Sequence, residues 1–186
     1  MKLPFDFSIQ HFDEVESTNS LAQDYAAHGA REGLVIVAEY QTGGRGKPGR
    51  KWVSPSGKNL LFSIVLRPPI TANKAPILTQ IACRSVAAVL KKFFAIDSEF
   101  KFPNDILVEG KKICGILVES QTGAGNKIEN MIVGIGLNIN SRAKDLLPEA
   151  TSIIELTGKE HQKEEVLEEI LEQLKKDIEE LYAHPV

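Results

Sequence analysis

The sequence has few cysteines, no long apolar run and no excess of positive charge. Its 186 residues include only two cysteines, Cys83 and Cys114, which form no C-x-x-C pair and have no pair of histidines beside them. A disulfide framework and a zinc site are therefore not expected, and both thiols are predicted to be buried and reduced. The formal net charge of -3 argues against a broad electrostatic surface for DNA or RNA. An anion-binding site must then come from a local concentration of positive charge.

Segments that would direct the chain into or across a membrane are also missing. Residues 1–15 carry acids and no apolar run, so they do not resemble a secretory signal. The longest apolar region, residues 77–96, is interrupted by Arg84, Lys91 and Lys92, and is not expected to span a membrane. We therefore expect a cytoplasmic protein that binds neither membrane nor DNA.

The composition that remains is that of an ordinary globular protein, with 42% hydrophobic and 25% charged residues. Apolar periodicity and capping residues predict helices and strands along the whole chain. The expected strands are 34–39, 59–67, 98–105 up to Pro103, a hairpin over 106–120 with its turn at Glu109-Gly110, and 129–140; the expected helices are 18–29, 76–94 and 163–182. The elements do not alternate strictly, so we expect an α+β fold, a mixed β-sheet with helices packed on it, in one domain spanning 1–186.

Residues 42–52, TGGRGKPGRKW, place Gly44, Gly46 and Gly49 at the spacing G-x-G-x-x-G. A dinucleotide-binding turn needs a helix directly after the glycines, and Pro48 with the following RKWVSPSG prevents one. A P-loop fails as well, because Gln41 stands at its first glycine position and Pro48 at its Ser/Thr position. The stretch therefore indicates neither of these two nucleotide-binding turns.

The same stretch instead predicts a flexible loop with a high density of positive charge. The cations are Arg45, Lys47, Arg50 and Lys51. Guanidinium groups suit carboxylate or phosphate oxygens, and Trp52 adds a flat face for a ring. On composition alone, an exposed basic turn without a ligand is an equal alternative.

Four motifs together decide between these alternatives. They are ESTN at 16–19, EYQTGGRGKPGRKW at 39–52, KFPNDILVEGKKICGILVE at 101–119 and GIGLNIN at 134–140. In sequence, order and spacing they resemble the biotin protein ligases over residues 12–182. The resemblance implies a mixed β-sheet flanked by helices, similar to the catalytic domains of class II aminoacyl-tRNA synthetases.

The resemblance also implies an activity. Such enzymes join biotin and ATP into biotinyl-5′-AMP, release pyrophosphate, and transfer biotin to one lysine of a biotin carboxyl carrier domain, as in acetyl-CoA carboxylase. ATP and biotin would be the substrates, with Mg²⁺ as cofactor. The chemistry brings a carboxylate against an anionic phosphate, and two such charges about 4 Å apart repel by about 4 kcal/mol at an effective dielectric of about 20. Cations held in place beforehand, here Arg45, Arg50, Lys112 and Mg²⁺, would offset that repulsion.

The matched positions imply three sets of site residues. Biotin would be bound by Ser17, Thr18, Asn19, Gln41, Gly44, Arg45, Gly46, Lys47, Lys112 and Gly115. ATP would be bound by Arg45, Arg50, Trp52, Asn104, Lys112 and Asn138, and Asp105 would hold Mg²⁺. Lys112 and Arg45 are the expected catalytic residues.

Several of these residues have a purely structural alternative. Residues 17–19 could simply cap a helix, Asp105 could be a turn residue, and Trp52 could belong to the core. Lys111 stands beside Lys112, and the spacings from PND and to GILVE both favour Lys112.

The sequence departs from the family pattern in two residues and in its domains. Lys47 stands where many members have a second arginine, and Phe102 where a tryptophan is frequent. No helix-turn-helix domain precedes Ser17, so no repressor function is expected. No small β-barrel follows the last helix, which puts the C-terminal contribution to ATP binding and carrier docking in doubt. A homodimer through an edge strand is compatible with the sequence.

Two rival functions stay open. A lipoate or octanoate ligase or transferase shares the fold and also modifies a carrier lysine, whereas GRGKPGRKW with Trp52 favours biotin. A biotin-binding sensor without catalysis would keep the pocket but release no pyrophosphate.

Overall fold

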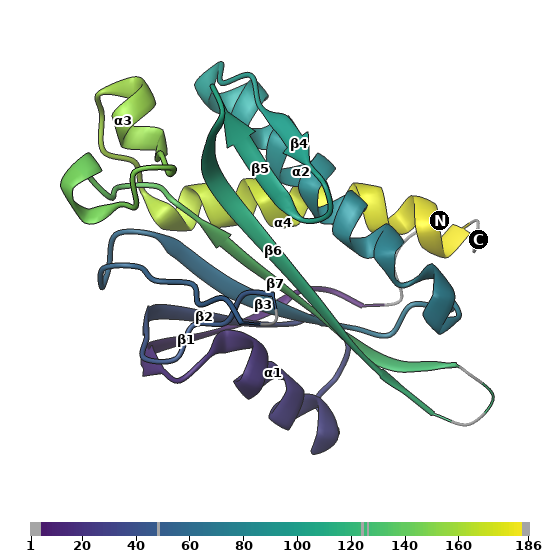
Figure 1. Cartoon of the computed structure of the whole chain (residues 1–186). Helices are drawn as coiled ribbons and strands as arrows, with labels where there is room; N and C mark the ends of the chain where they lie inside the picture. Colours follow the sequence, from purple (N-terminus) through teal and green to yellow (C-terminus); the bar gives the residue numbers. More distant parts are fainter. Residues whose placement is uncertain (1–4, 48, 124, 126, 184–186) are drawn as a thin grey trace.

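A seven-stranded β-sheet organises the chain, with one shorter helix against one face and two long helices against the other (Figure 1). The computed structural model describes residues 5–47, 49–123, 125 and 127–183. Its strands are β1 (Ser8–Val15), β2 (Leu34–Gln41), β3 (Leu60–Leu66), β4 (Glu99–Lys101), β5 (Asp105–Val108), β6 (Lys111–Thr122) and β7 (Ile128–Leu137). Its α-helices are α1 (Thr18–Ala27), α2 (Pro76–Phe94), α3 (Ile153–Thr157) and α4 (Lys163–Ala183). The expected α+β architecture is confirmed.

The strand order is β1-β2-β3-β7-β6-β5-β4, and the pairing of β1 with β2 is parallel whereas all other pairings are antiparallel. Val15, the last residue of β1, lies opposite Gln41, the last residue of β2. Parallel strands end at the same edge of a sheet. Residues 17–19, which follow β1, therefore lie next to Gln41 at the end of β2.

Side-chain alternation gives the two faces of the sheet different characters. Cys114 and Ile116 of β6 point into the main core, which also contains the inner faces of α2 and α4. The alternate residues of β6 have the opposite direction, so Gly115, Leu117 and Glu119 face the side on which α1 lies. One face of β6 therefore packs in the hydrophobic core, and the other face is available for a binding site.

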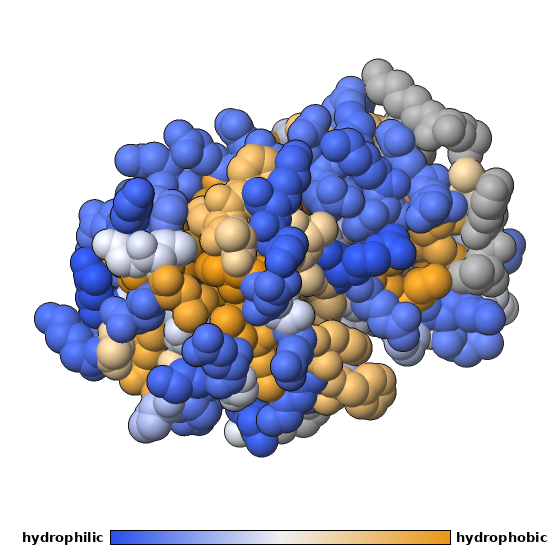
Figure 2. Space-filling model, turned by 90° about the horizontal axis from the view of Figure 1, so that it is seen from above, coloured by the Kyte–Doolittle hydropathy of each residue, from blue (hydrophilic) through white to orange (hydrophobic). Residues whose placement is uncertain are grey.

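α1 contacts β3, β2 and β7, whereas α2 and α4 pack against each other on the opposite face (Figure 1). The apolar stripe of α4 is buried as its 3.6-residue period predicts. Seen from above, apolar side chains gather toward the middle of an otherwise hydrophilic surface (Figure 2). Among the described helices, none has the length and apolar character that a membrane span requires.

Most predicted elements are confirmed, and the differences have local causes. The hairpin turn falls at Glu109 and Gly110, both with positive φ, as a two-residue turn of type I′ requires. β7 ends at Leu137, three residues before the predicted end, because the backbone N–H groups of Ile139 and Asn140 donate to the side chain of Asn59 and the backbone of Lys58 instead of to a strand. β1 was not predicted, since its exposed residues carry no buried apolar pattern.

Candidate functional site

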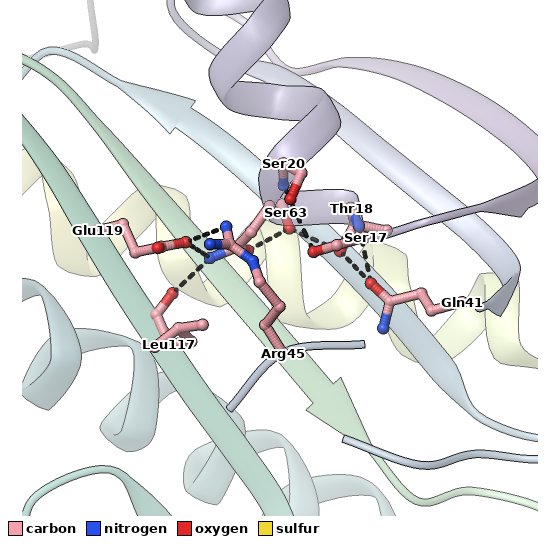
Figure 3. A network of polar contacts seen from close by, with 9 residues as sticks. Ser17, Thr18, Ser20, Gln41, Arg45, Ser63, Leu117 and Glu119 are labelled. Carbon is pink, nitrogen blue, oxygen red and sulfur yellow. Dashed lines mark hydrogen bonds and ion pairs between the residues drawn. The ribbon is translucent and has the colours of Figure 1, made fainter. Parts of the chain in front are cut away.

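The N-terminus of α1 brings polar side chains to the centre of one sheet face (Figure 3). Ser17 caps the helix, and its hydroxyl accepts a hydrogen bond from the backbone N–H of Ser20 at 3.4 Å. Thr18 donates its backbone N–H and its hydroxyl to Oε1 of Gln41, at 2.7 and 3.0 Å. Ser17, Thr18 and Asn19 are all buried. The capping role is therefore real, and it fixes the orientation of the predicted biotin-binding residues.

Asn19 is held from three directions. Its Nδ2 donates to the backbone oxygen of Leu117 at 3.2 Å and to Oε2 of Glu119 at 2.8 Å. Its Oδ1 lies 2.6 Å from the hydroxyl oxygen of Ser63, which also contacts the hydroxyl oxygen of Thr18 at 2.7 Å. Donors and acceptors with fixed directions suit a small ligand that carries both kinds of group.

The basic loop folds back on itself as a short hairpin. The backbone N–H of Gly46 donates to Arg50 at 3.0 Å, and that of Trp52 donates to Gly44 at 3.0 Å. Arg45 and Lys51 form an isolated antiparallel bridge. Pro48, on which the exclusion of a P-loop depends, lies outside the described residues. Backbone hydrogen bonds thus connect the two arms of this segment, the described residues 44–47 and 49–52, which we call the basic hairpin.

Among the described residues, one ion pair joins the basic hairpin to β6. Nη2 of Arg45 lies 2.6 Å from Oε2 of Glu119 (Figure 3). The side chains of Arg50 and Lys51 are exposed, and Lys47 is partly buried. Of the four predicted cations, Arg45 is the one that the structure brings to the α1 N-terminus.

Trp52 lies across two glycines of neighbouring strands. Gly115 of β6 is paired with Gly136 of β7, and a Cβ atom on either residue would lie 2.8 or 2.6 Å from the Trp52 ring. No real side chain tolerates such a contact, so both positions require glycine for the ring to lie where it does. We call this pair the glycine floor. The Trp52 ring nitrogen is buried and has no hydrogen-bond partner among the described residues.

Lys112 and Asp105 form the second ion pair of the site, with Nζ 2.8 Å from Oδ1. The two side chains are 33% and 20% exposed, respectively. Nζ of Lys112 also lies 5.3 Å from the centre of the Trp52 ring, a cation–π distance. The structure thus places Lys112 beside the glycine floor, whereas the neighbouring Lys111 is exposed. A cation so placed can stabilise negative charge above the floor.

Asn104 and Asn138 are held by the backbone around them. Nδ2 of Asn104 donates to the backbone oxygen of Ile116 at 2.6 Å, while its Oδ1 is buried without a partner among the described residues. Nδ2 of Asn138 donates to the backbone oxygen of Thr151 at 3.0 Å, and its Oδ1 accepts from Asn59 at 3.2 Å. Asn138 is therefore a buried clamp between loops, and its assignment to ATP stays a prediction.

The two cysteines take no part in this chemistry. Both are free and buried, as predicted. Burial, reinforced by the charge of Asp105, raises the pKa of Cys83 to about 12. Burial also raises the pKa of Cys114 well above its ordinary value, and Cys83 adds to the effect. Both groups stay neutral thiols at physiological pH, so neither supplies a nucleophile or a soft metal ligand.

Two further observations limit what the site can hold. The described residues contain no group of three or more His, Cys, Asp or Glu side chains that could hold a metal ion. A cavity of about 800 Å³ lies elsewhere, between the N-terminal segment, β1 and the end of α1, and no predicted site residue lines it. The candidate site is therefore the open face around the α1 N-terminus and the glycine floor.

Three residues of this region were not identified from the sequence. Ser63 is the single polar residue in the buried strand LLFSIVL, and Glu119 has the same strand parity as Gly115, so both carry a signal that periodicity could have found. Asn59 precedes a strand as many turn residues do. Its side chain bonds Asn138, Ser54 and the backbone N–H of Ile139, which only the folded chain reveals.

Comparison with known proteins identifies the family. The model of the biotin/lipoate A/B protein ligase family matches residues 12–138. The chain belongs to this family.

Family members with known names cover most of the chain. The bifunctional ligase/repressor BirA of Bacillus spizizenii is 37% identical over 163 residues, which make up 86% of this chain and 50% of that protein. The biotin–[acetyl-CoA-carboxylase] ligase of Mycobacterium tuberculosis is 30% identical over 155 residues, or 79% of this chain and 56% of that protein. The chain thus spans about half the length of the curated relatives that it matches.

The fold is shared with solved structures of the family. The biotin protein ligase of Aquifex aeolicus, in complex with biotin and ATP, superposes with a TM-score of 0.78 at 30% identity, covering 95% of this chain and 72% of that one. The biotin protein ligase of Leishmania major, in complex with biotinyl-5-AMP, gives a TM-score of 0.74 at 27% identity. The seven-stranded sheet with its helices is therefore the catalytic fold of biotin protein ligases.

Proposed function

We propose that this protein is an ATP-dependent biotin–protein ligase. It would form biotinyl-5′-AMP and then transfer biotin to a lysine of a biotin carboxyl carrier domain. The observation that carries the proposal is the meeting, on one sheet face, of a fixed hydrogen-bonding network, a glycine floor and two cations from separate segments. Relatives of this family are named as biotin ligases, and one of them was solved with biotin and ATP.

The polar network at the α1 N-terminus would bind the ureido head of biotin. Thr18, Asn19 and Gln41 present fixed donors and acceptors, with Ser17 fixing the helix end from which two of them project. The ring system and valeryl chain of biotin would extend from this pocket toward Trp52, whose ring covers the glycine floor, with the carboxylate toward Lys112. Gly44, Gly46 and Lys47 would cover the ligand as part of the basic hairpin.

The first reaction would occur where Lys112 and Arg45 face the same ligand. A carboxylate oxygen of biotin attacks the α-phosphorus of ATP, the new C–O–P link forms, and the bond to pyrophosphate breaks. Lys112, Arg45 and Arg50 would stabilise the charge that develops on the phosphate oxygens, as cations held in place beforehand do. Trp52 would stack on adenine, and Asn104 and Asn138 would contribute to binding the nucleotide.

Mg²⁺ would arrive with the phosphates of ATP. Because the described residues offer no three-ligand cluster, the protein would contribute one carboxylate, Asp105, and the phosphates and water would complete the coordination. That arrangement is usual for Mg²⁺, which keeps much of its hydration shell. The ion would lower the negative charge that the biotin carboxylate meets.

The second reaction would leave AMP and a biotinylated carrier. The amine of the carrier lysine attacks the carbonyl carbon of the adenylate and loses a proton to water, an amide bond forms, and AMP departs with the bonding electrons and its phosphate oxygen. The carrier would reach the site from the open sheet face around the α1 N-terminus.

The test is pyrophosphate release and biotin transfer in one reaction with biotin, ATP, Mg²⁺ and a carboxylase carrier domain. Both products are expected. Pyrophosphate without transfer would remove the transfer step from the proposal, and binding of biotin without pyrophosphate would identify a sensor. A larger rise of the melting temperature with lipoate than with biotin, each with ATP, would assign the site to the other acid.

A further inference from the structure

Glu119 occupies a central position in the site without a role in the reaction described so far. Its side chain projects from β6 on the same face as Gly115, and it is 26% exposed. One of its oxygen atoms, Oε2, has two partners from different parts of the chain, Arg45 of the basic hairpin and Asn19 of α1. Figure 3 shows the side chains of Arg45 and Glu119 meeting between β6 and the helix end.

We propose that Glu119 is a positioning residue, which aligns Arg45 for the substrate anion and fixes the cation relative to the head-group pocket. This inference rests on the proposed function and adds to it a residue to which the motif match assigned no role.

The geometry of Arg45 indicates that Glu119 aligns the guanidinium for the ligand and does not hold it away from the ligand. The contact with Glu119 uses Nη2 alone. A guanidinium has five N–H donors in a planar fork, so the remaining N–H groups can bind a carboxylate or phosphate while Glu119 keeps its hold. Without such a partner, the side chain of an arginine on a short hairpin samples many rotamers. Restricting it to one rotamer during the reaction would cost conformational entropy and raise the activation barrier.

The geometry of Asn19 gives the second half of the role. A carboxylate can only accept hydrogen bonds, so Glu119 requires the Nδ2 group of Asn19 to point toward β6. The Oδ1 atom of Asn19 must then point toward Ser63, at 2.6 Å. One carboxylate oxygen therefore sets the direction of an amide in the pocket and the position of a cation beside it.

Replacing the charge without changing the shape tests the inference. Glu119→Gln keeps the size and the acceptor oxygen of the side chain and removes its charge. We expect the rate of pyrophosphate release at saturating biotin and ATP to fall about three- to tenfold, the range of a partly exposed hydrogen bond between charged groups. The dissociation constant for biotin alone, read from the fluorescence of Trp52, the sole tryptophan, is expected to change by no more than about twofold, because Asn19 keeps an acceptor.

The matched control is Glu129→Gln, which makes the same charge change at an exposed position of the neighbouring strand β7. It is expected to behave as the unchanged protein in both measurements. A double-mutant cycle with Arg45→Gln supplies the readout that a merely structural role would not move. If Glu119 acts through Arg45, its replacement in the Arg45→Gln background has almost no further effect.

Three outcomes would overturn the inference. They are an unchanged rate for Glu119→Gln, a faster rate, which would mean that Glu119 competes with the substrate for Arg45, and an equal loss in the presence and absence of Arg45. Circular dichroism melting of each variant separates a loss of folding from a loss of alignment.

Proteolysis separates failure of this inference from failure of the proposed function. Trypsin cleaves after Arg45, Arg50 and Lys51, all in the basic hairpin. Without ligand, Glu119→Gln is expected to be cut there about two- to fivefold faster than Glu129→Gln, because an exposed ion pair restrains its segment to that extent. If the unchanged protein releases no pyrophosphate, the proposed function and the catalytic part of this inference fall together. Equal cleavage of the two variants would show, independently of activity, that Glu119 does not hold the hairpin.

Discussion

The two halves of the candidate site are built in opposite ways. At the α1 N-terminus, buried side chains bond to one another and to the sheet, so that Thr18, Asn19 and Ser63 have little freedom. The basic hairpin is largely exposed, and one ion pair and the Trp52 ring connect its side chains to the sheet. A rigid pocket suits the uncharged head of a ligand, and an adjustable arm suits charges that change during a reaction.

This contrast reflects the cost of burial for different groups. Hydroxyls and amides can be buried when each finds a partner, and they then fix direction. A cluster of cations cannot be buried before its anion arrives, because desolvation of unpaired charge costs far more than a hydrogen bond returns. The cations therefore stay at the surface or pair with Glu119 and Asp105.

The largest effect is expected where the two halves meet the reacting atoms. Lys112→Ala should lower the rate of pyrophosphate release by about 10²-fold or more, the usual effect of losing one group that stabilises developing charge. Lys111→Ala, on the neighbouring exposed residue, is the control and should have little effect. The assay is pyrophosphate release with saturating biotin and ATP. A normal rate for Lys112→Ala would show that another residue supplies the cation.

The next effect sharpens the description of the rigid half. Ser63→Ala removes the hydroxyl that contacts Thr18 and Asn19 inside the core, and should lower the free energy of unfolding by about 1–3 kcal/mol. Urea unfolding measures this value. Thr71→Ala, at an exposed hydroxyl far from the network, is expected to cost less than about 0.5 kcal/mol. Equal costs for the two variants would mean that the network is not rigid.

A third change affects binding more than folding. Gln41→Ala leaves the backbone N–H and the hydroxyl of Thr18 without their acceptor, and should weaken biotin binding about fivefold to tenfold, corresponding to about 1–1.4 kcal/mol. Isothermal titration with biotin alone is the measurement. Unchanged affinity would place the head group away from the α1 N-terminus.

The smallest effect tests the adjustable half. Arg50→Gln should change the free energy of unfolding by less than about 0.5 kcal/mol, because its side chain is exposed. The same change should raise the KM for ATP, and this rise should shrink as salt is added, since exposed charges are screened. Urea unfolding measures the stability, and initial-rate kinetics at several salt concentrations measure the KM for ATP. A large loss of stability would show that the hairpin belongs to the rigid half.

Motifs and periodicity predicted the sheet, the long helices and the segments that meet at the site. Local chemistry was sufficient there, as in the Glu109-Gly110 turn and the buried stripe of α4. The partners of each site residue could not be predicted, because Glu119 reaches Asn19 and Arg45 across 100 and 74 positions of the chain. The exposed strand β1 was missed for a related reason: its pairing with β2, rather than its own residues, makes it a strand.

That pairing has a consequence for how the protein tolerates change. β1 and β2 run parallel with Val15 opposite Gln41. The position of the α1 N-terminus relative to Gln41 therefore depends on the number of residues in each of the two strands. Inserting or deleting one residue in either strand would turn side chains to the opposite face and separate Thr18 from Gln41. The basic hairpin closes on itself between Gly44 and Trp52, and imposes no such alignment on the rest of the chain. Length changes should therefore be tolerated in the hairpin and excluded from β1 and β2, so that the loop can diversify in length while the pocket varies by substitution alone.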